Sequence, residues 1–282
     1  MTGWRFAFSR RWLGYLALAL AFAIACVFLA QWQLARREQA RAEITRVQSN
    51  WDSAPRPVEQ LLPALGAFDP DDKWTPVSLS GHYLVEKQLL ARGRPLDGAG
   101  GFEVLVPLQL ANGRVFIVDR GWVAAGNTTD SPDSIPAPPT GAVTVVARLK
   151  SSEPTIPGRS APAGQIATIH LPDIAQQIGE PTYIGAYGLL ATENPAPPTR
   201  PIAVTKPTPD EGPHLSYAFQ WIAFGILGFI ALGWAIRQEY RIRNRDAPAE
   251  QARLERQRRK AATQPRSDAE VEDAILDRDH SR

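Results

Sequence analysis

The sequence is poor in residues that bind and exchange metal ions. It has one cysteine, Cys26, and one methionine, Met1, in 282 residues. A single cysteine excludes an intramolecular disulfide, and the scarcity of thiolate and thioether ligands argues against a copper(I) carrier. The four histidines show no pair at the spacing of a metal site: His82, His170, His214 and His280. A net charge of +2 gives no argument for binding to nucleic acid or to an acidic substrate.

Recognisable enzyme motifs are also missing from the sequence. It contains no phosphate-binding glycine loop, no nucleophile elbow and no metalloprotease helix. Charged residues beside expected strand ends are interpreted as a solvated rim or as ion pairs: Arg92, Arg94, Asp119 and Arg120. His82 and His170 are interpreted as surface or strand histidines. We therefore expect a protein that is not an enzyme.

Long hydrophobic segments are present, and there are two of them. Residues 13–30 and 217–236 carry no charge, and a helix of twenty residues spans about 30 Å, the thickness of a bilayer's hydrocarbon core. A cleaved signal peptide and a lipoprotein signal ending at Cys26 are alternatives for the first segment, which is longer than either requires. We predict transmembrane helices over residues 13–31 and 214–236.

Small residues indicate how the two helices pack. Ala17, Ala21 and Ala25 repeat every four residues in the first segment, and Gly225 and Gly228 offer small positions in the second. Small residues let membrane helices approach closely. The pattern favours packing of the alanine row against the glycines, and the alternative is that alanine is simply common in helices.

Positive charge around the second segment indicates the orientation, whereas the charge around the first is ambiguous, because the arginines that follow it are diluted by Glu38 and Glu43. Four arginines directly follow the second segment: Arg237, Arg241, Arg243 and Arg245. By the positive-inside rule this end is cytoplasmic, so two crossings place both termini in the cytoplasm. We expect a cytoplasmic N-terminus at 1–12, an extracytoplasmic domain at 32–213 and a charged cytoplasmic tail at 237–282. Residues 1–12 are too short for a mitochondrial transit peptide, which favours a bacterial plasma membrane.

The segment between the helices has the period of β-strands. Residues 102–110 alternate, Asn112-Gly113 predicts a type I′ hairpin turn, and 114–119 returns as the partner strand. Pro107 predicts an edge strand or a bulge. Further strands are expected near 77–81, 88–92, 142–150, 165–169 and 182–190, with short helices near 57–65 and 172–178. The expected class is an α+β membrane protein whose helices flank an antiparallel, β-rich domain, with closure into a barrel left open.

Two segments lie outside this pattern. Residues 194–213 hold seven prolines and predict a stiff, extended connector to the second membrane helix. Residues 246–282 are charged, balanced in sign and poor in aromatic residues. They predict a solvated tail with a helix near 249–262. Residues 33–48 are rich in helix formers and are expected to extend the first helix outward.

His214 differs from the other histidines in its location. It lies at the start of the second hydrophobic segment, at the interface opposite the arginines. An imidazole that faces an apolar cleft can bind haem iron. Tyr217 and Trp221 are four residues apart on one helix face, and Gln220 is also within two turns. An interfacial histidine that only forms hydrogen bonds is the alternative, and the residues alone leave both readings open.

Five motifs occur in order at 31–37 (QWQLARR), 77–83 (VSLSGHY), 100–108 (GGFEVLVPL), 118–123 (VDRGWV) and 213–221 (PHLSYAFQW). Together they resemble the motifs of the SURF1 (Shy1) family of cytochrome c oxidase assembly factors, in a bacterial form, and the resemblance covers about residues 12–245. Two positions depart from the family pattern. Val106 stands where threonine is usual and Asp119 where asparagine is usual, and Asp119 beside Arg120 suggests a local ion pair.

The resemblance implies a role in maturing the catalytic subunit of a haem-copper oxidase. It implies transient binding of haem a by the histidine that matches His214, with Tyr217 and Trp221 shaping the slot. Arg120 could pair with a haem propionate or with a partner subunit. The implied partners are an oxidase subunit and membrane lipid, without nucleic acid. Two alternatives are a haem-free scaffold for oxidase subunits and an extracytoplasmic sensor that signals through residues 246–282.

Overall fold

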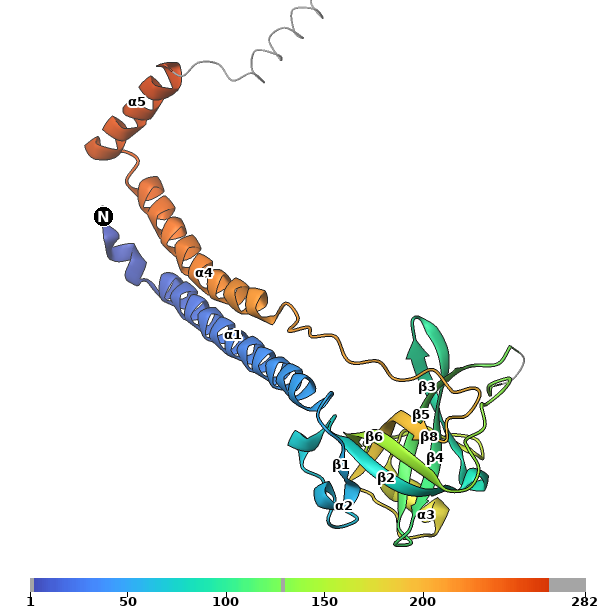
Figure 1. Ribbon diagram of the computed structural model, residues 1–282. Helices are drawn as coiled ribbons and strands as arrows, with labels where there is room; N and C mark the ends of the chain where they lie inside the picture. Colours follow the sequence, from blue (N-terminus) through green and yellow to red (C-terminus); the bar gives the residue numbers. More distant parts are fainter. Residues whose placement is uncertain (1–2, 128–129, 264–282) are drawn as a thin grey trace, which may run out of the picture. The chain divides into compact units, whose positions relative to one another are not determined.

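The computed structural model describes residues 3–127 and 130–263 (Figure 1). Most of the tail beyond the helix near 249–262 therefore lies outside the described residues. The chain forms two compact units, one made of residues 1–37 and 213–282 and the other of residues 38–212. The described residues of the first unit are mainly helical, and the second unit contains the sheet.

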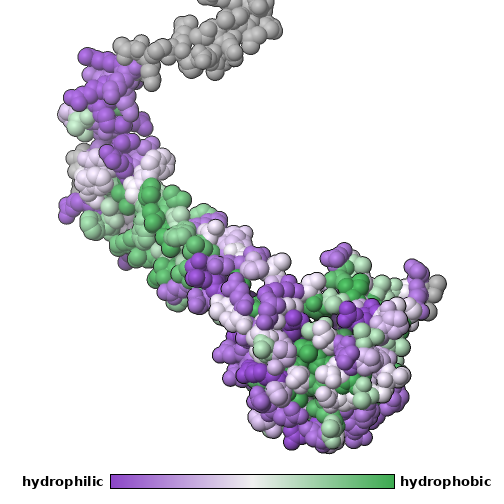
Figure 2. Space-filling view, viewed as in Figure 1, coloured by the Kyte–Doolittle hydropathy of each residue, from purple (hydrophilic) through white to green (hydrophobic). Residues whose placement is uncertain are grey.

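Two long helices dominate the helical unit. α1 spans Arg10–Asn50 and α4 spans His214–Arg243, and both are long and apolar enough to cross a membrane. Hydrophobic side chains cover much of their visible surface (Figure 2). α1 contains 41 residues, about 60 Å of helix, and so confirms that the first helix extends beyond its hydrophobic segment. A 3₁₀ helix, η1 (Trp4–Phe8), precedes α1, and α5 (Pro248–Thr263) confirms the helix predicted near 249–262.

The two long helices pack along rows of shielded residues, most of them small, that are spaced alternately three and four apart. The shielded positions are 214, 218, 221, 225 and 228 on α4 and 19, 23, 26, 30 and 33 on α1. A Cβ atom added to Gly225 would lie 3.5 Å from the Cβ of Cys26, and one added to Gly228 would lie 3.3 Å from Phe22. The predicted glycine positions are confirmed.

The predicted alanine row is wrong. Ala17, Ala21 and Ala25 are all exposed, whereas Ala23 and Ala30 are shielded. α1 contains several rows of small residues, and a spacing of four drifts around the helix because one turn takes 3.6 residues. Only the contacts with α4 select the row that packs, and the sequence of α1 alone does not contain them.

This packing predicts a disulfide in a single-site variant. Gly225→Cys is expected to pair with Cys26 under mild oxidation, because their Cβ atoms would lie 3.5 Å apart, within the range of disulfides. After proteolysis between the helices, a non-reducing gel should show the two fragments still linked.

Gly233→Cys is the matched control for this disulfide. Nothing lies within 4 Å of a Cβ at position 233, so its fragments should separate. Equal linkage in the two variants, or none in Gly225→Cys, would contradict the helix packing.

The second unit is an eight-stranded sheet with the order β1-β2-β6-β8-β5-β4-β3-β7. The strands are β1 (Arg56–Pro57), β2 (Pro76–Tyr83), β3 (Leu89–Leu96), β4 (Ala99–Leu110), β5 (Val115–Ala124), β6 (Val143–Ser151), β7 (Gln165–Ile166) and β8 (Ala186–Asn194). β2 also pairs with β4, which closes β2, β6, β8, β5 and β4 into a five-stranded barrel. The short helices are α2 (Val58–Leu61), η2 (Pro70–Asp72), η3 (Val85–Lys87) and α3 (Leu171–Ile178).

The α+β class is confirmed, and the barrel resolves the question that the sequence left open. Most pairings are antiparallel, but β8 runs parallel to β5 and antiparallel to β6. β8 begins at residue 186, four residues later than expected, because Thr182 forms only an isolated bridge with Val115.

Strand alternation divides the core into two clusters. The predicted inward face of β4 is buried with Phe116 and Val118 of β5 in one cluster. The intervening residues Leu105 and Ile117 belong to the other cluster, on the opposite face of the sheet. α3 covers this second face with apolar residues of its own. Successive residues of β5 therefore belong to different core clusters, on opposite faces of the sheet.

The β4–β5 hairpin is confirmed, but its turn is not type I′. The loop is Ala111–Gly113, in which the Gly113 N–H donates to the Leu110 carbonyl, and only Gly113 has a positive φ, 76°. A three-residue loop of this kind needs one left-handed residue, whereas a type I′ turn needs two. Pro107 is not on an edge strand. It lies in β4 where the partner changes from β3 to β2, so its missing N–H interrupts no continuous pairing.

The proline-rich connector is extended but attached to the barrel. Ile202 and Trp122 exchange two backbone hydrogen bonds of 2.8 Å. Gly121 permits this approach, since a Cβ there would lie 2.4 Å from the Ile202 carbonyl oxygen. Lys206 also pairs with Asp52 at 2.6 Å. The family-like motif at 118–123 thus contributes to close backbone packing.

Candidate functional site

His214 is the first residue of α4 and is held by a side chain of α1. Pro213 occupies the N-cap position, and its carbonyl accepts a hydrogen bond from the Tyr217 N–H. The His214 Nδ1 lies 2.9 Å from the Oε1 of Gln33. Gln33 is only 9% exposed. The ring is therefore positioned by two helices whose sequences are 181 residues apart.

This contact defines which ring nitrogen can bind a ligand. A carbonyl oxygen can only accept a hydrogen bond, so the contact with Gln33 Oε1 fits the tautomer of His214 that carries its proton on Nδ1. The lone pair of the neutral ring is then on Nε2. A neutral imidazole with an available Nε2 is the common axial ligand of haem iron.

The two aromatic residues expected near His214 have different environments. Trp221 is half-buried on the row that faces α1, two turns from His214, and meets Phe224 edge-on at 5.8 Å between ring centroids. Tyr217 is 47% exposed and lies beside this row. An imidazole, two aromatic rings and an apolar helix surface fit the chemistry of a haem macrocycle. Gln220 is also exposed.

Arg120 is not available to a haem propionate or to a partner. Its side chain and that of Glu193 are both fully buried and form an ion pair of 2.8 Å. Arg120 also donates to the Pro136 carbonyl at 2.8 Å, and the Tyr83 hydroxyl donates to Glu193 at 3.0 Å. The suggested pairing of Arg120 with a haem propionate or a partner subunit is therefore wrong, because the guanidinium already has its partners inside the barrel.

Asp119 does not pair with Arg120, because adjacent strand residues point to opposite faces. Its Oδ1 accepts a hydrogen bond from the Gly121 N–H at 2.9 Å, and its Oδ2 has no partner among the described residues. Burial, and then the charge of Glu103, raise the pKa of Asp119 to about 8, although the Gly121 N–H opposes the shift. The local ion pair expected from the sequence is wrong.

The remaining charged candidates form ordinary ion pairs. Arg92 pairs with Asp130, and Arg94 pairs with Glu153 at 2.6 Å. His170 lies 3.0 Å from Asp173 on the surface of α3. Among the described residues, no group of three His, Cys, Asp or Glu side chains could hold a metal ion.

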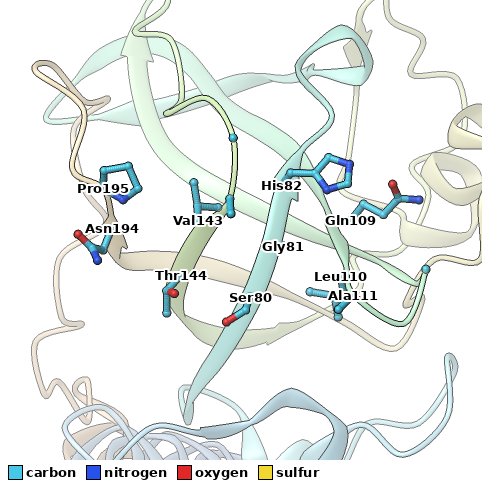
Figure 3. A pocket seen from close by; sticks show the side chains of 13 residues that line it. Ser80, Gly81, His82, Gln109, Leu110, Ala111, Val143, Thr144, Asn194 and Pro195 are labelled. Carbon is cyan, nitrogen blue, oxygen red and sulfur yellow. The ribbon is translucent and has the colours of Figure 1, made fainter.

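His82 is exposed, as expected, and lines an open groove of about 1010 Å³ at one end of the barrel (Figure 3). Other side chains on the groove are uncharged, including Ser80, Gln109 and Asn194. The groove therefore offers hydrogen-bonding groups but no cluster of acidic or basic residues.

Comparison with known proteins extends over most of the chain. Residues 20–226 match the model of the SURF1 family. The chain belongs to the SURF1 family. It is 35% identical over 249 residues to uncharacterized SURF1-like proteins of Mycobacterium tuberculosis and Mycobacterium bovis, covering 86% of this chain and 90% of each relative. The SURF1 family is a family of oxidase assembly factors rather than of catalysts, and the resemblance drawn from the five motifs is confirmed.

Sequence reasoning missed Gln33. The residue lies in the first SURF1-like motif, which was identified without assigning a role to this side chain. One signal was available, because a polar side chain near the end of a membrane helix is costly to bury without a partner. Nothing in the sequence identified His214 as that partner.

Proposed function

We propose that this SURF1-family protein assists assembly of a haem-copper oxidase by holding haem a at His214 while the catalytic subunit matures. The observation that carries the proposal is the position of His214. It begins an apolar helix, and its Nδ1 is occupied by Gln33, which leaves Nε2 for a ligand. The SURF1-like motif around this histidine supports the same role.

The proposed location is a bacterial plasma membrane with both termini in the cytoplasm. Trp4 of η1 stacks on Tyr240 of α4 with ring centroids 4.3 Å apart, and Arg11 pairs with Glu239 at 2.9 Å. These contacts support an antiparallel helix pair whose two termini share one end. Arg10 and Arg11 and the arginines between 237 and 245 lie at that end, and aromatic rings are typical of membrane interfaces. His214 belongs to the opposite end of α4.

The chain's own residues would bind and orient the cofactor. Haem a, when bound, supplies an iron atom that accepts a nitrogen ligand. His214 would provide Nε2, Trp221 and Tyr217 would provide aromatic contact, and the apolar surface of α4 would reduce the access of water. No residue is required to form or break a covalent bond. The oxidase subunit and membrane lipid are the proposed partners.

The test is the optical spectrum of protein purified in detergent from cells that make haem a. The parent protein is expected to carry a haem a band, and His214→Ala is expected to lose it, because the iron would lose its protein ligand. His82→Ala is the matched control and should keep the band, since His82 is an exposed residue of the barrel.

Each outcome separates the candidate functions. A band that persists in His214→Ala would exclude His214 as the ligand. No band in any of the three proteins would contradict haem holding and favour a haem-free scaffold for oxidase subunits. Circular dichroism of the variants would verify that each is folded.

A further inference from the structure

We infer that Gln33 is a positioning residue that holds His214 in the Nδ1–H tautomer and thereby presents Nε2 to an incoming metal centre. The inference rests on the proposed function for the identity of that centre. The tautomer itself is a property of the protein without haem. It can therefore be measured independently.

The position of Gln33 makes this contact costly to lose. Gln33 is 9% exposed and lies on the face of α1 that packs against α4. The neighbours on this face are apolar or small, including Ala30 and Cys26. A buried polar group without a partner costs roughly 1–3 kcal/mol. Gln33 and His214 thus stabilise one another, and the ring cannot turn freely.

The hydrogen bond selects a tautomer that imidazole does not favour in water. Without a partner, a neutral histidine side chain prefers the proton on Nε2, which would block this nitrogen as a ligand. The 2.9 Å contact reverses the preference, because Gln33 Oε1 offers only an acceptor to Nδ1. The site is therefore prepared for ligation before the cofactor arrives.

The same contact increases the basicity of the ligand. A metal-bound histidine usually donates its second N–H to an acceptor, and loss of that acceptor typically reduces metal affinity 10–100-fold. A neutral amide is a weaker acceptor than a carboxylate. Gln33→Glu should therefore keep the tautomer, donate more electron density through the ring and lower the reduction potential of the bound haem.

The first experiment measures the tautomer in haem-free, full-length protein in detergent. Nitrogen-15 NMR of protein labelled in histidine distinguishes the two ring nitrogens, and His214→Ala identifies the signal of His214. The parent is expected to show Nδ1–H, and Gln33→Leu is expected to show Nε2–H or a mixture. Gln31→Leu, at an exposed position one half-turn away, is the matched control and should resemble the parent.

The second experiment adds haem a to the same four proteins and to Gln33→Glu. Gln33→Leu should bind about 10–100-fold more weakly than the parent, and Gln33→Glu should restore binding with a lower potential. An Nε2–H signal from the parent, or equal affinity in Gln33→Leu, would overturn the inference. An Nδ1–H signal with no haem binding in the parent would support the positioning by Gln33 and overturn the proposed haem function instead.

Discussion

Replacing Arg120 with leucine is expected to destabilise the barrel by about 3–5 kcal/mol, because it leaves a buried carboxylate without its counter-charge. Glu193 is fully buried and receives two contacts from Arg120, at 2.8 and 3.3 Å. Among the described residues, the Tyr83 hydroxyl would remain as its side-chain partner. The carbonyl oxygen of Pro136 would also lose its hydrogen bond.

Chemical unfolding of the full chain in detergent, followed by tryptophan fluorescence, would measure this change. Lys206→Ala is the control, since it removes an ion pair whose side chains are 42% and 68% exposed. Such pairs contribute about 0–1 kcal/mol. Arg120→Leu combined with Glu193→Leu should recover part of the loss, because no charge is then left buried. If Arg120→Leu alone were as stable as the Lys206→Ala control, the buried ion pair between Arg120 and Glu193 would be contradicted.

Asp119→Asn is expected to stabilise the sheet domain at neutral pH and to flatten its dependence on pH. The Asp119 carboxyl is buried, its pKa is raised to about 8, and Oδ2 lacks a partner among the described residues. Asparagine keeps an oxygen for the Gly121 N–H and replaces the second oxygen with a donor. The asparagine side chain is uncharged at every pH, so its energy beside Glu103, Lys150 and Arg94 would not change with protonation of this position.

The direction of this pH dependence follows from the number of protons bound in the folded and unfolded states. In the folded state Asp119 stays protonated up to about pH 8, whereas in the unfolded chain it ionises near pH 4. Its contribution to stability is thus complete below pH 4 and is lost as pH rises toward 8, at up to about 1.4 kcal/mol per pH unit.

Unfolding free energies from pH 4.5 to 8 should therefore fall less steeply in Asp119→Asn than in the parent. Asp173→Asn, at a position 57% exposed on α3, is the control and should keep the parent slope. Parallel curves for Asp119→Asn and the parent would show that Asp119 is not the titrating group.

Local periodicity predicted which segments of this protein form strands and helices better than it predicted which strands pair with one another. The inward face of β4 was predicted because alternation at 102–110 is a property of consecutive residues. The partners of β8 were not, since β6 and β5 are distant in sequence and one pairing is parallel. The prediction of a type I′ turn at Asn112-Gly113 was wrong for a related reason. The dipeptide permits a type I′ turn, but the register of β4 and β5 selects a longer loop.

The candidate site shows the same division. His214 was predicted from its place at the start of an apolar helix, and the resemblance supplied a reason to prefer it. Gln33 required knowledge of which face of α1 packs against α4, and the alanine row selected from the sequence was the wrong one. Arg120 was expected either at a solvated rim or in an ion pair, and the structure has the ion pair; its buried partner, Glu193, could not be predicted because it is distant in sequence.

The place of β8 in the barrel has a consequence for biosynthesis. β8 lies between β6 and β5, so the barrel cannot close before residues 186–194 have left the ribosome. Until then the nascent sheet has two open edges, although the first hydrophobic helix has already been made. Only the connector then separates β8 from α4. Completion of the barrel and insertion of the second helix therefore become nearly simultaneous events, and a chain truncated before β8 would expose unpaired strands to aggregation.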